Sequence, residues 1–311
     1  TDGAMNVAVG YSALGSEDGS TQSVAIGHNA LAAQNAAVSS AHNVAIGSQA
    51  GAAITTGDQN TFVGGLCGDA NTTGRNNAAF GYFSLSSNTT ANENAAFGVN
   101  SLYLNTTGTA NTAVGTYSLQ NNTTASYNTA VGYQSSYSNT TGERNVTVGP
   151  FSGYALTSGS GNTFVGAYDT GAGGAGSNIT TGSKNTILGK FNGNEDGLDI
   201  RTSSNNIVLS DGDGNVKLYI NNGDTYLFNI VSLPSASVQG FGISGQTIYT
   251  SATSTSQRDH HLFFNGNGVV GTIRTSGSNT SYNTSSDYRL KENVDYTWDA
   301  TTRLKQLKPA R

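Results

Sequence analysis

The chain has 311 residues and a formal net charge of −5; 41 residues are glycine, and only 11% are charged. So few basic residues exclude a general electrostatic surface for nucleic acid. The lack of any run of about 18 apolar residues excludes a membrane-spanning helix. Cys67 is the single cysteine, so no disulfide can form within the chain.

One five-residue phrase, Asn-x-x-[Val/Phe]-Gly, returns along most of the chain. From Gly47 to Gly166 the closing glycine recurs every 17 residues, and "NIVLS" at 206–210 is a degraded last copy. A second phrase, Asn-Thr-Thr-Gly, follows with the same period and predicts a turn, because Asn and Gly adopt left-handed backbone angles at low cost. The closing glycines are Gly10, Gly27, Gly47, Gly64, Gly81, Gly98, Gly115, Gly132, Gly149, Gly166 and Gly189.

A period of 17 residues is too short for a pair of helices. It fits one coil of a parallel β-solenoid, in which successive coils stack about 4.8 Å apart. We therefore predict an all-β fold with a repeat shaft over residues 1–210. The chain opens within the pattern, at "TDGAMNVAVG", so we expect it to be a piece of a longer protein.

The repeated strand is apolar on both sides. Thr112 and Val114 point to one side, whereas Asn111, Ala113 and Gly115 point to the other. Such a pattern is typical of a strand that is buried on both faces. A thin coil has only one interior, so the second face needs a neighbour, which a homotrimer would supply. The sequence leaves open which side faces inward.

The recurring asparagines allow two interpretations. Stacked side-chain amides can hydrogen-bond from coil to coil as a structural ladder, and many of the same positions are also Asn-x-Ser/Thr glycosylation sequons. We favour the ladder because the repeat itself generates the sequons. Cys67 falls where other coils carry Ser84, Ser101 or Ser118, which predicts a packing role for it.

Residues 211–285 are predicted to form a β-rich tip module. Residues 205–224 indicate a hairpin around an Asp-Gly-Asp-Gly turn. Asp211, Asp213 and Asn215 have the first spacing of a calcium loop, but the glycine and the distal Glu are missing, so no metal site and no cofactor are predicted. Aromatic residues that could form a sugar or protein site in this module are Tyr226, Phe228, Phe241, Tyr249, Phe263 and Phe264.

The repeat phrases resemble those of a known family. "SVAIG" at 23–27 and "NVAIG" at 43–47 look like the β-roll repeats in the heads of trimeric autotransporter adhesins, and closely similar repeats occur in phage tail fibres and tail spikes. The resemblance covers residues 6–210. It implies a homotrimeric left-handed parallel β-solenoid.

The basic end of the chain carries a second resemblance. "SSDYRLKEN" and "LKQLKP" are similar to the start of the intramolecular chaperone auto-processing domain of phage tail spikes, fibres and endosialidases. This implies that residues 286–311 begin such a domain, cut short here. The residues themselves predict a short helix at 300–307, ended by Pro309. The resemblance also implies self-cleavage between Ser285 and Ser286, with Ser286 as nucleophile and Lys291 as general base. A serine needs such a base, and a lysine acts as one only when its pKa is lowered.

Together these features predict a phage tail fibre or tail spike, an extracellular part of the virion that attaches it to the host. The expected partners are two further copies of the chain, other tail or baseplate proteins, and a host surface receptor, glycan or protein. One alternative is a bacterial trimeric autotransporter adhesin head. Another is a polysaccharide-degrading tail spike, but glycosidase chemistry needs two facing carboxylates, and no such cluster recurs in the sequence.

Overall fold

A computed structural model describes most of the first 221 residues and short stretches of the remainder. Every regular element within the described residues is a β-strand, which confirms the all-β prediction. The chain divides into two compact units, Thr1–Ser251 and Ala252–Arg311. The short helix predicted at 300–307 lies outside the described residues. These are 5–16, 19, 22–35, 41–166, 173–195, 197–221, 224–227, 240–244, 247–251, 258–265, 268–276 and 278–284.

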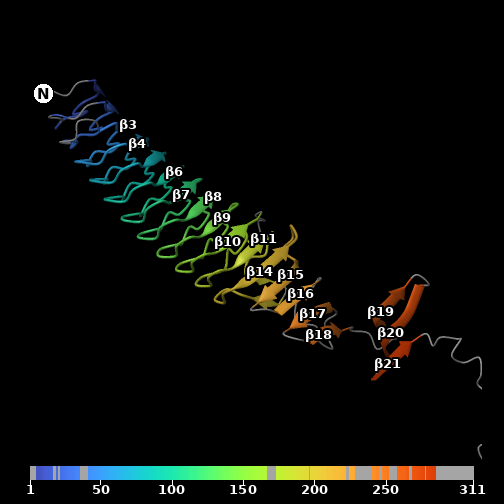
Figure 1. Cartoon of the computed structure of the whole chain (residues 1–311). Helices are drawn as coiled ribbons and strands as arrows, with labels where there is room; N and C mark the ends of the chain where they lie inside the picture. Colours follow the sequence, from blue (N-terminus) through green and yellow to red (C-terminus); the bar gives the residue numbers. More distant parts are fainter. Residues whose placement is uncertain are drawn as a thin grey trace, which may run out of the picture. The chain divides into compact units, whose positions relative to one another are not determined.

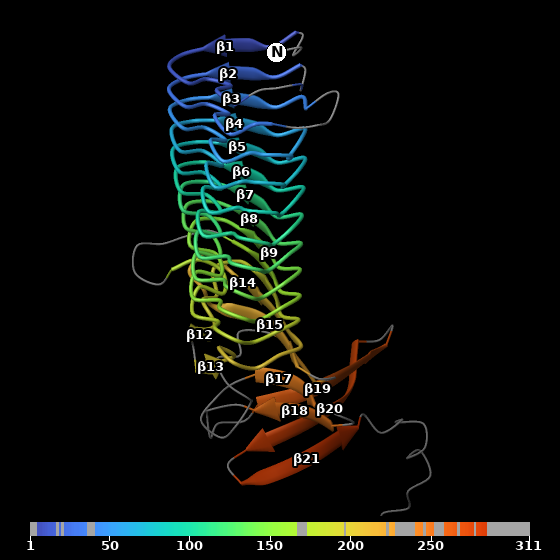
Figure 2. The ribbon, with the colours of Figure 1, turned by 90° about the vertical axis from the view of Figure 1, so that its left-hand side faces the viewer.

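The repeat phrases form a stack of short parallel strands, one per coil (Figures 1 and 2). Neighbouring strands pair in the register of the 17-residue repeat, so Thr112 lies beside Thr129 and Ala113 beside Ala130. The predicted parallel β-solenoid is therefore confirmed. The strands are β1 (Val7–Val9), β2 (Val24–Ile26), β3 (Val44–Ile46), β4 (Thr61–Val63), β5 (Ala78–Phe80), β6 (Ala95–Phe97), β7 (Thr112–Val114), β8 (Thr129–Val131), β9 (Val146–Val148), β10 (Thr163–Val165) and β11 (Thr186–Leu188).

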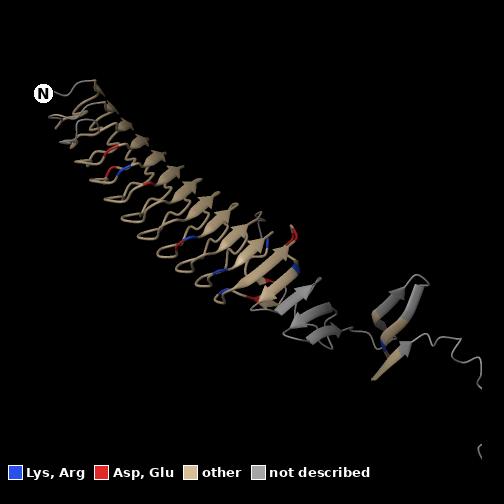
Figure 3. Cartoon of the chain, viewed as in Figure 1, with Lys and Arg blue, Asp and Glu red and all other residues tan. Residues whose placement is uncertain are grey.

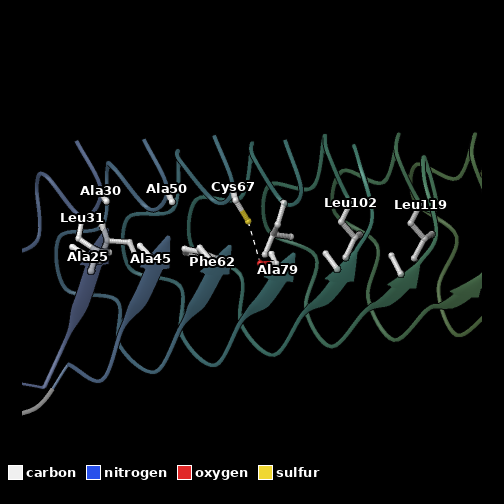
Figure 4. Packing of buried hydrophobic residues seen from close by; sticks show 14 of the residues in the cluster. Ala25, Ala30, Leu31, Ala45, Ala50, Phe62, Cys67, Ala79, Leu102 and Leu119 are labelled. Atoms are coloured by element: carbon white, nitrogen blue, oxygen red, sulfur yellow. Dashed lines mark hydrogen bonds between the residues drawn. The ribbon is translucent and has the colours of Figure 1, made fainter. Parts of the chain in front are cut away.

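From β2 to β11 the middle residue of each strand points into the coil, and in most of these strands it is alanine. Ala113 and the preceding Asn111 are fully buried, whereas Val114 is 39% exposed. This answers the question that the sequence left open: the Ala and Asn side faces inward, and the Val, Ile or Phe side faces outward. Figure 4 shows the inward Ala25, Ala45 and Ala79 in a row along the strands, with Leu31 packed beside Ala25.

Two phenylalanines interrupt the column of inward alanines, and glycines make room for them. Phe62 is fully buried, and a Cβ on Gly68 would lie 2.7 Å from its ring. A Cβ on Gly51, one coil earlier, would lie 3.1 Å from the same ring. The ring of Phe164 likewise lies 3.3 Å and 2.7 Å from where a Cβ would stand on Gly153 and on Gly176. Large and small residues are thus matched across the coil, as close packing requires.

The glycine that closes each strand has a backbone conformation that other residues rarely adopt. At Gly98 φ is +137°, and a Cβ there would lie 2.6 Å from the carbonyl carbon of Gly115 in the next coil. The repeat therefore needs glycine at this position both for its dihedral angle and for the close approach of two coils.

We expect Gly98→Ala to lower the free energy of unfolding by about 1–3 kcal/mol, because a strained backbone angle is combined with a backbone contact between coils. Chemical denaturation followed by circular dichroism measures this. The matched control is Gly212→Ala, since a Cβ at Gly212 meets nothing within 4 Å. Equal losses for the two variants would contradict the explanation.

The sheet continues beyond the last repeat. β14 (Asn206–Ser210), the degraded copy, pairs in parallel with β11, and then forms an antiparallel hairpin with β15 (Val216–Asn221). The hairpin around the Asp-Gly-Asp-Gly turn is therefore confirmed. β16 (Asp224–Leu227), β17 (Gly240–Ser244) and β18 (Thr247–Ser251) extend the same sheet, while β12 (Asn194–Glu195) and β13 (Leu198–Asp199) form a small separate hairpin.

The described part of the second unit is an antiparallel three-stranded sheet. It consists of β19 (Arg258–Asn265), β20 (Gly268–Ser276) and β21 (Asn279–Thr284). The pairing of β19 with β20 is irregular between Asp259 and His261. His260 therefore lies at an irregularity of the ladder.

Candidate functional site

The residues predicted to carry self-cleavage are not among those that the structure describes. Ser285, Ser286 and Lys291 all lie outside the described ranges, so the catalytic pair stays a prediction. Within the described part of the chain, no group of three or more His, Cys, Asp or Glu residues could hold a metal ion. No helix in that part is long and apolar enough to cross a membrane.

The recurring asparagine of the main phrase forms a hydrogen-bonded ladder inside the solenoid. In the middle of the ladder, the backbone N–H of Asn111 donates to Asn94 Oδ1 at 3.0 Å, and the N–H of Asn128 donates to Asn111 Oδ1 at 3.0 Å. Asn111 Nδ2 also donates to the Ala125 carbonyl at 2.9 Å. The amides thus fasten each coil to the next and tie the strand to the far side of its own coil. Members are Asn43, Asn60, Asn77, Asn94, Asn111, Asn128, Asn145, Asn162, Asn185 and Asn206.

The Asn-Thr-Thr turns supply a second ladder, which shares carbonyl acceptors such as that of Ala125 with the first. It comprises Asn71, Asn88, Asn105, Asn122 and Asn139; each member after Asn71 donates from Nδ2 to the Oδ1 of the member before it, at 2.7–3.1 Å. All five are fully buried. In the folded solenoid these sequon asparagines are therefore inaccessible to a glycosylating enzyme.

Apolar residues occupy the same slot at both ends of the second ladder. Ile54 precedes Asn71 by one period and Leu156 follows Asn139 by one period; both are fully buried. Asn139 Oδ1 consequently has no hydrogen-bond partner. The core therefore changes from amide to aliphatic packing at this coil, a transition that the sequence predictions missed although the aligned repeats contain it.

Cys67 has the packing role that its slot predicted. Its Sγ donates a hydrogen bond to the Ala79 carbonyl at 3.2 Å, as the dashed line in Figure 4 shows. One coil later, Ser84 Oγ donates to the Ala96 carbonyl in the same way, at 3.0 Å. Burial raises the pKa of the Cys67 thiol to about 12. The thiol is therefore kept neutral and is not a nucleophile.

We expect Cys67 to resist a thiol-specific chromogenic reagent at pH 8 in the native chain and to react fully in denaturant. In the unfolded state the thiol has its ordinary pKa of 9.0, whereas in the folded state burial raises that pKa to about 12. Its burial thus contributes stability below pH 9.0 that is lost as the pH rises from 9.0 to about 12. In Cys67→Ser, which places the serine of the neighbouring coils in this slot, the free energy of unfolding should not fall over this pH range. Rapid native labelling would contradict the assignment.

The acidic turn after β14 is closed by its own side chains. Asp211 Oδ1 accepts hydrogen bonds from the backbone N–H groups of Asp213 (3.0 Å) and Asn215 (2.9 Å). Lys217 Nζ lies 3.0 Å from Asp211 Oδ2. The side-chain hydrogen bonds from Asn215 and Lys217 lower the pKa of the Asp211 carboxyl to about 2. The Asp211 side chain therefore caps the turn, and the positive charge beside its carboxylate is that of Lys217.

Two surfaces of the solenoid remain as candidate interaction sites. The first is the outer strand stripe, the apolar residue immediately before each closing glycine. Phe80 and Phe97 stack in it with their ring centroids 4.9 Å apart, and Ile46, Phe97 and Leu188 are 38%, 39% and 42% exposed. The stripe comprises Val9, Ile26, Ile46, Val63, Phe80, Phe97, Val114, Val131, Val148, Val165 and Leu188.

The second surface is the aromatic stripe, which lies on the turns that follow the closing glycines of five consecutive coils. Tyr82 and Tyr133 are 51% and 45% exposed, and the other members are part-buried. Rings of adjacent coils are in contact: Phe83 with Tyr103 at 5.6 Å and Tyr133 with Phe151 at 5.3 Å between centroids. The members are Tyr82, Phe83, Tyr103, Tyr117, Tyr133, Tyr137, Phe151 and Tyr154.

The coils that carry the aromatic stripe are almost free of charge. No Lys, Arg, Asp or Glu stands between Glu93 and Glu143, and Figure 3 shows this part of the solenoid without coloured residues. The sequence predictions placed aromatic sites only near the tip. The signal for this stripe was nevertheless present, because its members recur one, two or five residues after the closing glycines.

The tip aromatics lie on strands as far as the structure describes them. Tyr226 pairs with Tyr219, Phe241 with Thr250, and Gly242 with Tyr249. Phe263 and Phe264 belong to β19 in the second unit, and Phe228 lies outside the described residues. A sugar or protein site formed by these residues stays a prediction.

The fold and these two surfaces define a repeat protein of the parallel β-solenoid class, with an amide-bonded interior and a sparsely charged, partly aromatic exterior. No family model, curated protein or solved structure matches this chain.

Proposed function

We propose that the chain is the shaft and tip of a homotrimeric phage tail fibre or tail spike, which attaches the virion to its host. The outer strand stripe is the observation that carries this proposal. The stripe runs through successive coils, and Val9, Phe97 and Leu188 in it are 57%, 39% and 42% exposed. A continuous exposed apolar stripe of this kind favours a partner of matching length. A second and a third copy of the same solenoid have that length and that repeat.

The absence of charge in the stripe supports self-association. The outward residues of β5 to β8 are Ala, Thr, Val and Phe only, so three copies can approach without burying an unpaired charge. Three-fold closure leaves no copy with an uncovered stripe, as point-group symmetry requires of a closed oligomer. The resemblance of the repeats to adhesin heads and phage fibres agrees with this arrangement.

Maturation by self-cleavage is the second part of the proposal and rests on the terminal resemblance alone. Ser286 Oγ attacks the carbonyl carbon of Ser285 while Lys291 accepts the hydroxyl proton. The peptide nitrogen leaves with a proton, and an ester forms between the two serines. Water then hydrolyses the ester, which leaves a carboxylate on Ser285 and a free amine on Ser286. A slowly folding trimer would be released from its chaperone in this way and remain kinetically stable.

The test is the intact mass of the chain in the native particle, together with the mass of the assembly by light scattering. We expect three chains per assembly, each ending at Ser285, and we expect Ser286→Ala to abolish the cut. An uncut chain that continues past Arg311 would overturn the cleavage and favour a bacterial adhesin. A monomeric assembly would overturn the proposed trimer.

A further inference from the structure

We propose that the aromatic stripe is a binding track for a neutral polysaccharide lying along the solenoid. This inference rests on the proposed attachment function and names the chemistry of the receptor. It moves the predicted contact from the tip to the shaft, over the coils that begin at Gly81, Gly98, Gly115, Gly132 and Gly149.

Two exposed tyrosines and the part-buried rings beside them offer aromatic surface to a sugar chain. Aromatic faces stack on the apolar C–H faces of pyranose rings, and tyrosine adds a hydroxyl that can bond to the ligand. Tyr82 and Tyr133 are the most exposed members. Contacts run from Tyr82 through Phe83 to Tyr103, and from Tyr117 through Tyr133 and Phe151 to Tyr154. The stripe is therefore two ring clusters on neighbouring coils.

Two amides fill the gaps in the aromatic columns. Asn100 stands one period after Phe83 and one before Tyr117, and Gln120 stands one period after Tyr103 and one before Tyr137. Their side-chain oxygens, Asn100 Oδ1 and Gln120 Oε1, are buried and have no hydrogen-bond partner. A buried polar atom without a hydrogen-bond partner destabilises the fold. Both residues are only part-buried, so rotation of either amide would offer its oxygen to a ligand hydroxyl.

The sparsely charged surroundings select the class of ligand. Because Arg144 is the single basic residue in the sequence of these five coils and lies beside Tyr127, outside the stripe, an anionic polymer would find little positive charge there. Glu93 and Glu143 are the two carboxylate side chains of these coils, and they stand three coils apart, so one chain offers no facing pair for glycosidic cleavage. Binding without hydrolysis of a neutral glycan fits these residues best.

The extent of the stripe separates it from a self-association surface. The outer strand stripe continues from β1 to β11, whereas the connected aromatic contacts of the stripe cover five coils. A separate ring pair, Tyr11 and His28, occupies one of the same slots in the first two coils. A contact between identical solenoids would use the feature that every coil shares. Stacked coils repeat about every 4.8 Å, so five coils offer a track of about 20 Å. The spacing of the coils is similar to the length of one sugar ring in an extended chain.

The experiment measures retention of the full chain in native gels cast with dextran, yeast mannan, a soluble mixed-linkage β-glucan or, as the charged comparison, polygalacturonate. We expect retention by at least one neutral polymer, and no loss of retention at high salt. Tyr82→Ala combined with Tyr133→Ala should weaken binding at least about tenfold. Tyr127→Ala is the matched control, because Tyr127 is 57% exposed but lies outside the stripe, beside Arg144.

Each other outcome overturns the inference: no retention by any neutral polymer, equal retention of the double variant and the wild type, or salt-sensitive retention by polygalacturonate only. If the double variant does not fold, the single variants Tyr133→Ser and Asn100→Ala replace it, with thermal unfolding as the check. The trimer and its cleaved terminus are tested by light scattering and intact mass, not by the polysaccharide gels. Failure of the track thus leaves the fibre proposal intact, and failure of the trimer is recognised independently.

Discussion

Phe62→Ala is expected to lower the free energy of unfolding by about 3–5 kcal/mol, the usual cost of removing a buried phenylalanine. The ring is fully buried and fills the space left by Gly51 and Gly68. Neither glycine has a side chain that could move into the cavity, so little relaxation is available to reduce the loss. Denaturant unfolding followed by circular dichroism measures the change.

A second substitution tests the cause. The next coil carries Ala79 and Leu85 in the slots of Phe62 and Gly68. Leu85 has φ of +53°, close to the +58° of Gly68, so a leucine can adopt this backbone. We expect Gly68→Leu alone to destabilise the coil by overpacking, yet to restore part of the loss when combined with Phe62→Ala. Additive losses in the double variant would show that the two positions are not matched.

Asn111→Ala should lower the free energy of unfolding by about 2–4 kcal/mol, because buried groups lose partners that water cannot replace. The N–H of Asn128 loses its acceptor, and the Ala125 carbonyl loses one of its two donors. Asn111 is fully buried in the middle of its ladder. The position is therefore sensitive even though each bond is an ordinary amide contact.

The control for this variant is Asn121→Ala, a part-buried asparagine in the following turn, for which we expect a change within about 0.5 kcal/mol. Both variants remove the same chemical group, so the difference between them measures burial and the ladder. A loss at Asn111 no greater than that at Asn121 would show that the ladder does not stabilise the solenoid.

The sequence by itself determined the solenoid, its strand register and the position of its turns. A strict 17-residue period places identical residues on top of each other, and the pairing of Thr112 with Thr129 follows directly. The Asn ladder followed from the same argument. The Ser286–Lys291 pair depends on a resemblance only and stays a prediction.

Tertiary structure alone decided which face of the strand is the interior. Both faces are apolar, so hydrophobicity could not choose between Ala113 and Val114. Side-chain volume decided which face is inside. In the thin coil the strand packs against leucines such as Leu119, so only a small side chain fits on the inner face. A large one fits only where a glycine stands opposite, as Gly68 does at Phe62. The larger side chains are left outside as the outer strand stripe, where they are available to a partner.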